Sequence, residues 1–245
     1  LSAGARGLHH PAAVAVVPCS DCARYRCRQA SQSREICDGG VALHSKTMAY
    51  LHWLLLPFSI LWLLLAIKPH DRSVWIAENS FTVATVIALV WTYPSWPLSD
   101  VSYTLIVIFL VMHTIGGYYT YVRVPYDDAA HAVIGVRLSK LFGWARNHYD
   151  RLVHFAYGLL LAYPFFELFE LYARPVGYWS YVLSPVLVMA TSMIFEVLEW
   201  WATEILGSGQ GAAYLGAQGD EWDAQKDMAI ATLGSIITMV VVFMS

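Results

Sequence analysis

Apolar residues gather along this chain into long, nearly uninterrupted runs rather than into the short stripes of a soluble amphipathic helix. Six such runs occupy residues 49–67, 76–93, 101–119, 152–172, 178–201 and 225–243. A helix needs about 20 residues to cross the hydrocarbon core of a bilayer. The pattern therefore predicts an all-α fold, a polytopic bundle of about six membrane-spanning helices.

Aromatic residues mark the ends of these runs. The fifth run has Tyr178 and Trp179 at one end and Trp200 and Trp201 at the other. Trp and Tyr favour the headgroup level of a bilayer, where one side of the ring is apolar and the other is wet. The aromatic residues therefore support the predicted limits of the spans.

Composition points to the same class of protein. Hydrophobic residues make up 58% of the chain and charged residues 13%, whereas soluble domains have about 45–50% and about 25%. The net charge of −3 comes with no basic face, so we expect no nucleic-acid partner. The expected partner is the lipid bilayer, and the oligomeric state is left open.

The first 47 residues differ from the rest of the chain. They contain all four cysteines, Cys19, Cys22, Cys27 and Cys37, and end directly before Met48. Only the first pair has metal-ligand spacing, so these cysteines indicate no complete zinc site. We expect residues 1–47 to be a disordered tail or upstream sequence translated in error, with Met48 as the start of a membrane domain at 48–245.

Lys and Arg are distributed unevenly between the connections. The connections 1–2, 3–4 and 5–6 carry Lys68, Arg72, Arg123, Arg137, Lys140, Arg146, Arg151 and Lys226. The opposite side carries only Arg174 once residues 1–47 are set aside. The positive-inside rule then predicts that these three connections are cytoplasmic. Within the 3–4 connection we expect an interfacial helix, with Arg137, Lys140 and Arg146 facing lipid headgroups.

Ionisable residues within the runs gather at the predicted cytoplasmic ends of four helices. They are His113 in the third run, Asp150 and His154 at the start of the fourth, Glu196 and Glu199 at the end of the fifth, and Asp220, Asp223 and Asp227 at the start of the sixth. Residues three or four apart share a helix face. Because ionisable groups inside a membrane are costly, their convergence predicts a functional site.

Carboxylates and imidazoles from several helices can hold a divalent metal. We predict Asp220, Asp223, Asp227, Asp150 and His113 as metal ligands, and Glu196, Glu199 and His154 as catalytic residues. One of the carboxylates would act as general base toward a water molecule. The cofactor itself is not identified by the sequence beyond a possible divalent metal.

Structural roles compete with this interpretation. Asp150 is a candidate N-cap of the fourth helix, and Asp220 of the sixth, with Asp223 in its first turn. Glu78 opens the second helix, where capping competes with membership of the cluster. Glu167, near the opposite end of the fourth run, is interpreted as an interfacial residue.

Several stretches resemble a known family. SYTLIVIFLVMH followed by GGYYTYVRVPYD, then YDRLVHFAYG, FEVLEWW and LGAQGDEWDAQKDM are similar to the bacterial inner-membrane family of unknown function typified by YjdF. The resemblance covers residues 48–245, and a looser likeness extends to VanZ-like membrane proteins. It implies a multi-pass protein of the bacterial inner (plasma) membrane and no particular reaction. The family pattern leads us to expect a second histidine at position 118, where this chain has Tyr118.

Two functions from different classes remain open. The first is a membrane enzyme, metal-dependent, that acts on a lipid or polyprenyl headgroup at the cytoplasmic face. The second is a transporter or ion-handling protein that uses the same acids as a cation or proton site. Because the acids crowd one face and the helix centres are apolar, the pattern favours the enzyme. A non-catalytic interaction protein is a third possibility.

Overall fold

The computed structural model describes residues 50–206 and 218–245. Within these ranges the chain is helical and has no strand. The segment 1–47, its cysteines and the predicted start at Met48 lie outside the described residues.

Six helices are long and apolar enough to cross a membrane, which confirms the predicted polytopic bundle. They are Tyr50–Ile67, α2 (Arg72–Thr92), α3 (Asp100–Tyr118), α6 (Tyr149–Leu168, continued by the π-helical turn η1, Phe169–Ala173), α7 (Trp179–Leu206) and α9 (Asp223–Met244). Most begin a few residues before the apolar runs do. In α2, Asp71 accepts hydrogen bonds from the backbone of Ser73 and Val74, and this cap extends the helix beyond its apolar part.

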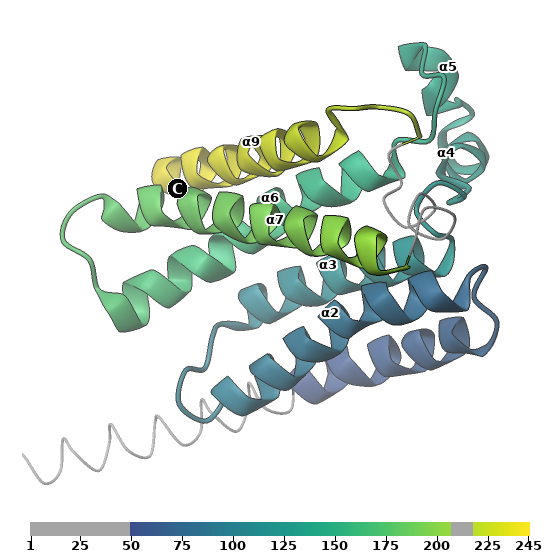
Figure 1. Cartoon of the computed structure of the whole chain (residues 1–245). Coiled ribbons are helices and arrows are strands. Elements are labelled where there is room, and N and C mark those ends of the chain that lie inside the picture. The colour runs from purple at the N-terminus through teal and green to yellow at the C-terminus, as the bar shows by residue number, and fades with distance from the viewer. Residues whose placement is uncertain (1–49, 207–217) are drawn as a thin grey trace, which may run out of the picture. The chain divides into compact units, whose positions relative to one another are not determined.

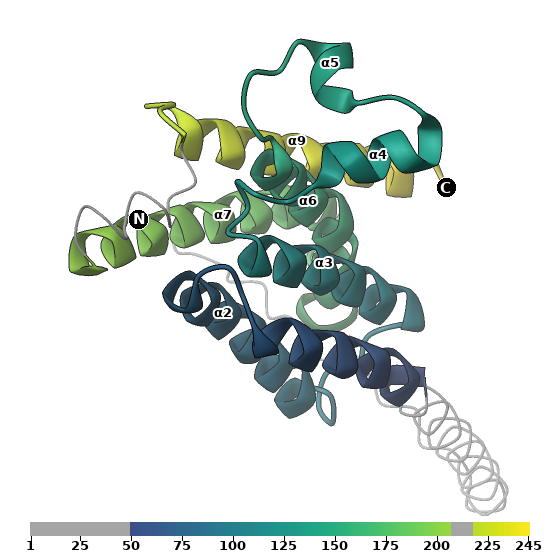
Figure 2. The ribbon, with the colours of Figure 1, turned by 90° about the vertical axis from the view of Figure 1, so that its right-hand side faces the viewer.

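The 3–4 connection contains two short helices, α4 (Tyr126–Ile134) and α5 (Leu138–Phe142). Each ends at a glycine in the left-handed conformation, Gly135 with φ 73° and Gly143 with φ 67°, which reverses the chain without steric cost. Figures 1 and 2 show both helices at the end of the bundle where α6 and α9 begin. Arg146, expected to face lipid, instead pairs with Asp223 of α9.

Helix α6 is the centre of the bundle, since it packs against α3, α7 and α9 (Figure 1). Its tightest contact is the crossing with α9. A Cβ atom on Gly158 would lie 1.8 Å from the carbonyl oxygen of Ala231, and one on Gly234 would lie 2.4 Å from that of Phe155. Only glycine lets the two backbones approach so closely, as in other close helix pairs of membrane proteins.

This crossing also sets the register of the polar residues. His154 lies one turn before Gly158 on α6, and Asp227 lies two turns before Gly234 on α9. The glycine contact therefore places the starts of the two helices side by side, with His154 and Asp227 facing each other.

A side chain at position 234 should disrupt the crossing. We expect Gly234→Val to destabilise the protein by about 1–3 kcal/mol, because the added atoms cannot fit against the α6 backbone. Ala229→Val adds a similar side chain to an exposed position of α9 and is the matched control. Thermal unfolding in detergent compares them, and equal midpoints for the two variants would contradict the close crossing.

Candidate functional site

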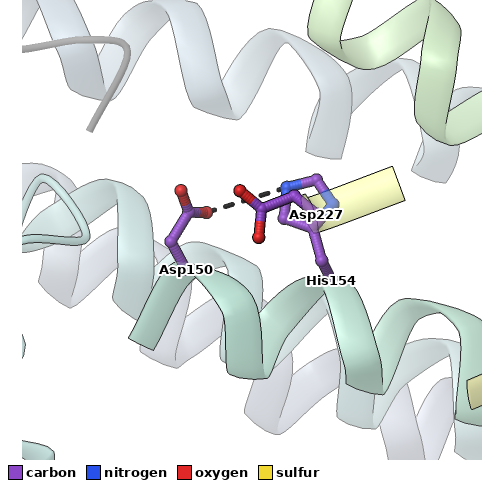
Figure 3. Close-up of side chains that lie close together, drawn as sticks. All are labelled: Asp150, His154 and Asp227. Carbon is purple, nitrogen blue, oxygen red and sulfur yellow. Dashed lines mark ion pairs between the residues drawn. The ribbon is translucent and has the colours of Figure 1, made fainter. Parts of the chain in front are cut away.

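Three predicted residues come together between α6 and α9. Asp150, His154 and Asp227 each offer a ligand atom, and these atoms all lie within 4.8 Å of one another. Figure 3 shows the three side chains converging on one space. We call Asp150, His154 and Asp227 the α6–α9 triad. Helix α6 has His148 at its N-cap position and no side-chain cap, so capping does not explain Asp150.

Glu196 of α7 adds a third carboxylate to this space. Its Oε1 atom lies 3.3 Å from His154 Nε2, while Asp150 Oδ1 lies 3.7 Å from the same nitrogen. Among the described residues, neither Glu196 Oε1 nor Asp227 Oδ1 has a hydrogen-bond partner, although both atoms are buried. Buried acceptors without donors are costly. The arrangement of these oxygens therefore suits a bound cation.

A small cavity opens beside the triad. It is lined by Phe81, Phe109, His113, Tyr121, Asp150, Val153, His154, Tyr157, Thr191, Ser192 and Phe195, and about 40 Å³ is open to the centre of a water molecule. One water needs about 10–15 Å³ by that measure. The cavity therefore has room for a few waters, next to carboxylate and imidazole groups that can orient them.

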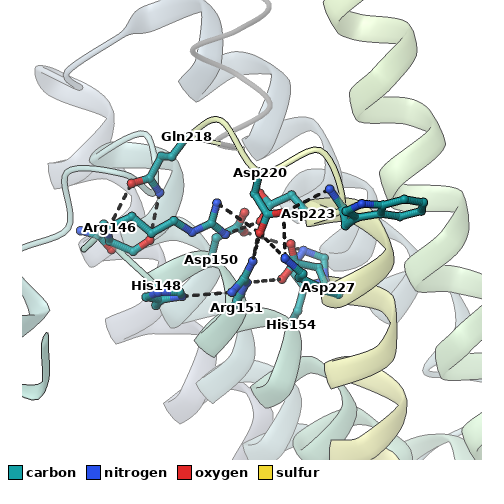
Figure 4. Close-up of polar contacts among 12 residues, drawn as sticks. Arg146, His148, Asp150, Arg151, His154, Gln218, Asp220, Asp223 and Asp227 are labelled. Carbon is teal, nitrogen blue, oxygen red and sulfur yellow. Dashed lines mark hydrogen bonds and ion pairs between the residues drawn. The ribbon is translucent and has the colours of Figure 1, made fainter. Parts of the chain in front are cut away.

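Asp220 and Asp223 are engaged differently from the triad. Arg151 donates to Asp220 at 2.6 Å and to Asp223 at 3.1 Å, Arg146 also donates to Asp223, and Lys226 donates to Asp220 at 2.6 and 2.8 Å. We call these five residues the ion-pair network (Figure 4). Arg151 also lies 4.0 Å from Asp227 of the triad, but its contacts with Asp220 and Asp223 are closer, so these two acids have less need of a metal than the triad has. Their assignment as ligands stays a prediction.

Next to the ion-pair network, Asn147 and Gln218 join the 3–4 and 5–6 connections of the bundle. The backbone N–H of Asn147 donates to Gln218 Oε1 at 3.1 Å, and Gln218 Nε2 donates to the Asn147 carbonyl at 2.9 Å. Together with the arginine–aspartate ion pairs, these two hydrogen bonds hold the start of α6 against the segment that leads into α9 (Figure 4). From the sequence, Arg151 is only a marker of topology and Arg146 is also expected to face lipid, and their closeness to Asp150 in chain order is the available signal of a role in the site.

His113 is occupied by other partners. Its Nε2 lies 3.1 Å from the backbone carbonyl of Glu78, and its Nδ1 lies 2.6 Å from the Tyr121 hydroxyl. A carbonyl only accepts, so Nε2 carries the proton and Nδ1 accepts from Tyr121. Both ring nitrogens are thus used in hydrogen bonds, and His113 as a metal ligand stays a prediction that would require breaking one of them.

Two buried glutamates lie near Tyr121. Glu78 and Glu199 are 1% and 7% exposed, and the cap at Asp71 makes Glu78 a second-turn residue rather than a cap. Burial raises the pKa of the Tyr121 phenol well above its usual value, and the carboxyls of Glu78, Asp150 and Glu199 raise it further. The carboxyl groups of α2, α6 and α7 therefore meet around one phenol, which the sequence did not single out.

Glu167 has a structural role at the opposite end. It accepts hydrogen bonds from the Ser99 backbone at 2.8 Å, from the Ser99 hydroxyl at 2.9 Å and from the Ser102 hydroxyl. These bonds tie α6 to the first turn of α3. Glu167 therefore does not belong to the polar site.

The described helices define the class, a polytopic α-helical membrane protein with a polar site at one end of its bundle. The family model described as "Predicted membrane protein (DUF2238)" matches residues 50–245. The chain is 36% identical over 177 residues to the inner membrane protein YjdF of Escherichia coli (strain K12), a match that covers 71% of this chain and 79% of the relative. No solved structure matches.

The chain therefore belongs to the DUF2238 family, which confirms the resemblance seen in the sequence. It is a multi-pass membrane protein, and the similarity to an inner-membrane relative together with the six apolar helices supports the inner membrane as its location.

The ion-pair network should make stability depend on pH. Hydrogen bonds from Lys226, and then from the Trp222 backbone and Arg151, hold the pKa of Asp220 well below its usual range. A carboxyl with a depressed folded-state pKa stabilises the fold above its unfolded pKa of about 4, and this contribution is lost as pH falls through the folded value. We expect Asp220→Asn to lower the unfolding midpoint at pH 7, by an amount that shrinks progressively below about pH 4.

Asp128→Asn is the control, because Asp128 forms only an exposed pair with Arg137. Unfolding midpoints of both variants and the parent, measured across pH, test the expectation. If the two substitutions lower the unfolding midpoint equally at pH 7, the ion-pair network does not stabilise the fold as proposed.

Proposed function

We propose that the protein is a metal-dependent membrane enzyme that acts on a lipid headgroup, with Asp150, His154 and Asp227 holding a divalent cation and Glu196 beside them. The observation that carries the proposal is the convergence of these ligand atoms within 4.8 Å, together with buried oxygens of Glu196 and Asp227 that form ion pairs but no hydrogen bond among the described residues. A helix bundle builds metal sites in this way, from inward-facing carboxylates and histidines of different helices.

The donor set indicates the kind of cation. One imidazole with two or three carboxylates offers borderline and hard ligands and no sulfur. This donor set suits Zn²⁺, Mn²⁺ or Fe²⁺ better than a set of oxygen ligands alone would. A divalent cation supplies charge stabilisation to a polarised oxygen and eases the ionisation of water. Three protein ligands leave coordination positions open for such chemistry.

Glu196 and the cavity supply the remaining elements of a hydrolytic site. Glu196 Oε1, which lies 3.3 Å from His154 Nε2 and forms no hydrogen bond among the described residues, can accept a proton from a water held beside the triad, which is the role of a general base. In this proposal His154 holds the cation, and Glu199 is a buried carboxyl near Tyr121 that stays a candidate catalytic residue.

The location of the site favours a headgroup as substrate. The triad lies in the first two turns of α6 and α9, at the end of the spans and therefore near headgroup level. The cavity has room for waters and none for a whole headgroup, so the bond to be attacked would be presented at its mouth. A lipid or polyprenyl phosphate ester meets this requirement.

The distribution of Lys and Arg supports placing this end at the cytoplasmic face. Single cysteines at Val133, in α4, and at Val176, before α7, would test it in whole cells with a membrane-impermeant thiol reagent. Both positions are highly exposed. Labelling of position 176 alone fits the proposal, whereas labelling of position 133 alone would mean that the topology is the reverse of the predicted one.

Ion handling is the second candidate. It is favoured by the excess of carboxyl groups, Glu78, Glu199 and Asp227 buried and Asp150 and Glu196 partly buried, over the histidines that face them. Buried acids in excess are typical of ion or proton pathways. Cation uptake by proteoliposomes without any conversion of lipid would favour this function over the enzyme.

Metal content tests the proposal. We expect close to one divalent ion per chain in protein purified without chelator, measured by elemental mass spectrometry. Asp227→Asn and Asp150→Asn should each reduce metal affinity more than roughly 10-fold, because loss of a ligand costs at least as much as loss of an outer-shell partner.

Glu170→Gln, at an exposed position of the opposite end, is the matched control and should keep the metal. A metal-free parent that also fails to take up Zn²⁺, Mn²⁺ or Fe²⁺ on addition would contradict the proposal. The same holds for an Asp227→Asn variant that retains full metal content.

A further inference from the structure

A pocket separate from the polar site lies between the first spanning helix, Tyr50–Ile67, and α2, which run side by side (Figures 1 and 2). Phe58, Ser59 and Trp62 line it from the first helix, and Thr82 and three aliphatic residues line it from α2. We call it the Thr82 pocket. Its volume is about 190 Å³, and a cavity of about 150 Å³ with apolar walls takes up a benzene ring. The pocket therefore has room for one six-membered ring.

The hydroxyl group of Thr82 lacks the partner that helix threonines usually have. Thr92 and Thr114 each donate to the carbonyl oxygen four residues earlier, at 2.7 Å. For Thr82 that oxygen belongs to Glu78, where it accepts from the Thr82 backbone, as in any helix, and also from His113 Nε2 at 3.1 Å. A carbonyl oxygen has two lone pairs, so none is left for the hydroxyl group.

Thr82 is only 1% exposed, and its hydroxyl oxygen has no hydrogen-bond partner among the described residues. It lies ten residues from both Arg72 and Thr92, the ends of α2, which is about 15 Å at 1.5 Å per residue. That distance is half the hydrocarbon thickness of about 30 Å, and the bilayer core holds no water that could bond the hydroxyl group. An unbonded hydroxyl group is costly in such surroundings. A ligand that brings an acceptor to this depth would remove the cost.

The depth of Thr82 decides which lipid fits. The ester and phosphate oxygens of a phospholipid stay near the edge of the hydrocarbon core, and its acyl chains carry no acceptor. A quinone differs, because its ring carbonyls enter the hydrocarbon core together with its isoprenoid tail. Both parts of a quinone ring match the pocket, since Phe58 and Trp62 supply aromatic walls and Thr82 supplies a donor.

The aromatic walls of the pocket are fixed before any ligand binds. The Trp62 indole N–H donates to Asn79 Oδ1 at 2.6 Å, which holds the ring against α2. Phe58 is buried, whereas Ser59 is exposed and adds a second hydroxyl group to the lining. A preformed apolar pocket with a few placed polar groups is typical of small-molecule sites.

We propose that the Thr82 pocket binds the ring of a lipid-soluble quinone, with Thr82 as the hydrogen-bond donor to one ring carbonyl. A helical threonine has two accessible χ1 rotamers, so its hydroxyl group turns to the ligand without a change in the backbone. The ring stacks against Phe58 and Trp62. Val83 and Ile87, 41% and 62% exposed, leave the pocket open to lipid, where the isoprenoid tail lies. Binding needs neither a metal nor the acids of the polar site.

Unfolding midpoints test the proposal, because a ligand that binds the folded chain raises them. The probes are decylubiquinone, which has ring carbonyls, and decylbenzene, which lacks them, each added to the full chain in detergent. We expect decylubiquinone to raise the midpoint well above the value with decylbenzene. Thr82→Val should weaken the binding of decylubiquinone about 5–10-fold, the effect of one hydrogen bond, and leave the response to decylbenzene unchanged.

Thr85→Val removes a hydroxyl group from α2 outside the pocket lining, so this matched control should bind decylubiquinone as the parent does. Equal shifts with the two probes would mean that the pocket takes any apolar ring, and would overturn the proposal. No shift with either probe, or equal affinity of the parent and Thr82→Val for decylubiquinone, would also overturn it. Should Thr82→Val fail to fold, Val83→Trp decides, because a side chain that fills the pocket must abolish the effect of decylubiquinone. An effect that persists in Val83→Trp would overturn the proposal.

Discussion

The close crossing of α6 and α9 is the contact on which the rest of the polar site depends. Gly158 and Gly234 let the two backbones touch, with no room for a Cβ atom on either glycine. Because a helix is rigid over a few turns, that contact fixes the spacing of Asp150 and His154 from Asp227. Lipid offers little hydrophobic drive for helix association, so tight packing and polar bonds between helices must supply it.

Charge is the second constraint. At the end of the bundle the carboxyl groups outnumber the basic side chains, and the ion-pair network makes its close contacts with Asp220 and Asp223, while Arg151 Nε lies 4.0 Å from Asp227 Oδ1. The carboxyl groups of Asp150, Glu196 and Asp227 therefore need further compensation. We assign a cation to the α6–α9 triad, beside the cavity.

Much of this arrangement could be predicted from the sequence. Apolar run length identified all six spans, and helical spacing put Asp150 beside His154 and Asp223 on one stripe with Asp227. The sequence does not show which partner each acidic side chain contacts. Whether an aspartate faces an arginine or another acid depends on the crossing of α6 and α9 and on how Asn147 meets Gln218.

Tyr121 and Glu78 show the same limit. The left-handed turn at Thr120 and Tyr121 has no sequence signature of the usual kind, because neither residue is Gly, Asn or Asp. The apolar run begins near Glu78 and so predicts a helix start there, whereas the Asp71 cap starts α2 earlier. In both cases tertiary contacts, rather than local pattern, bring the side chain into the site.

If the α6–α9 triad holds the cation, anomalous diffraction from crystals equilibrated with Mn²⁺ will locate the ion there. We expect an anomalous peak between Asp150, His154 and Asp227, within coordination distance of all three. A peak beside Asp220 and Asp223 instead, or no peak near any of these acids in well-diffracting crystals, would contradict it.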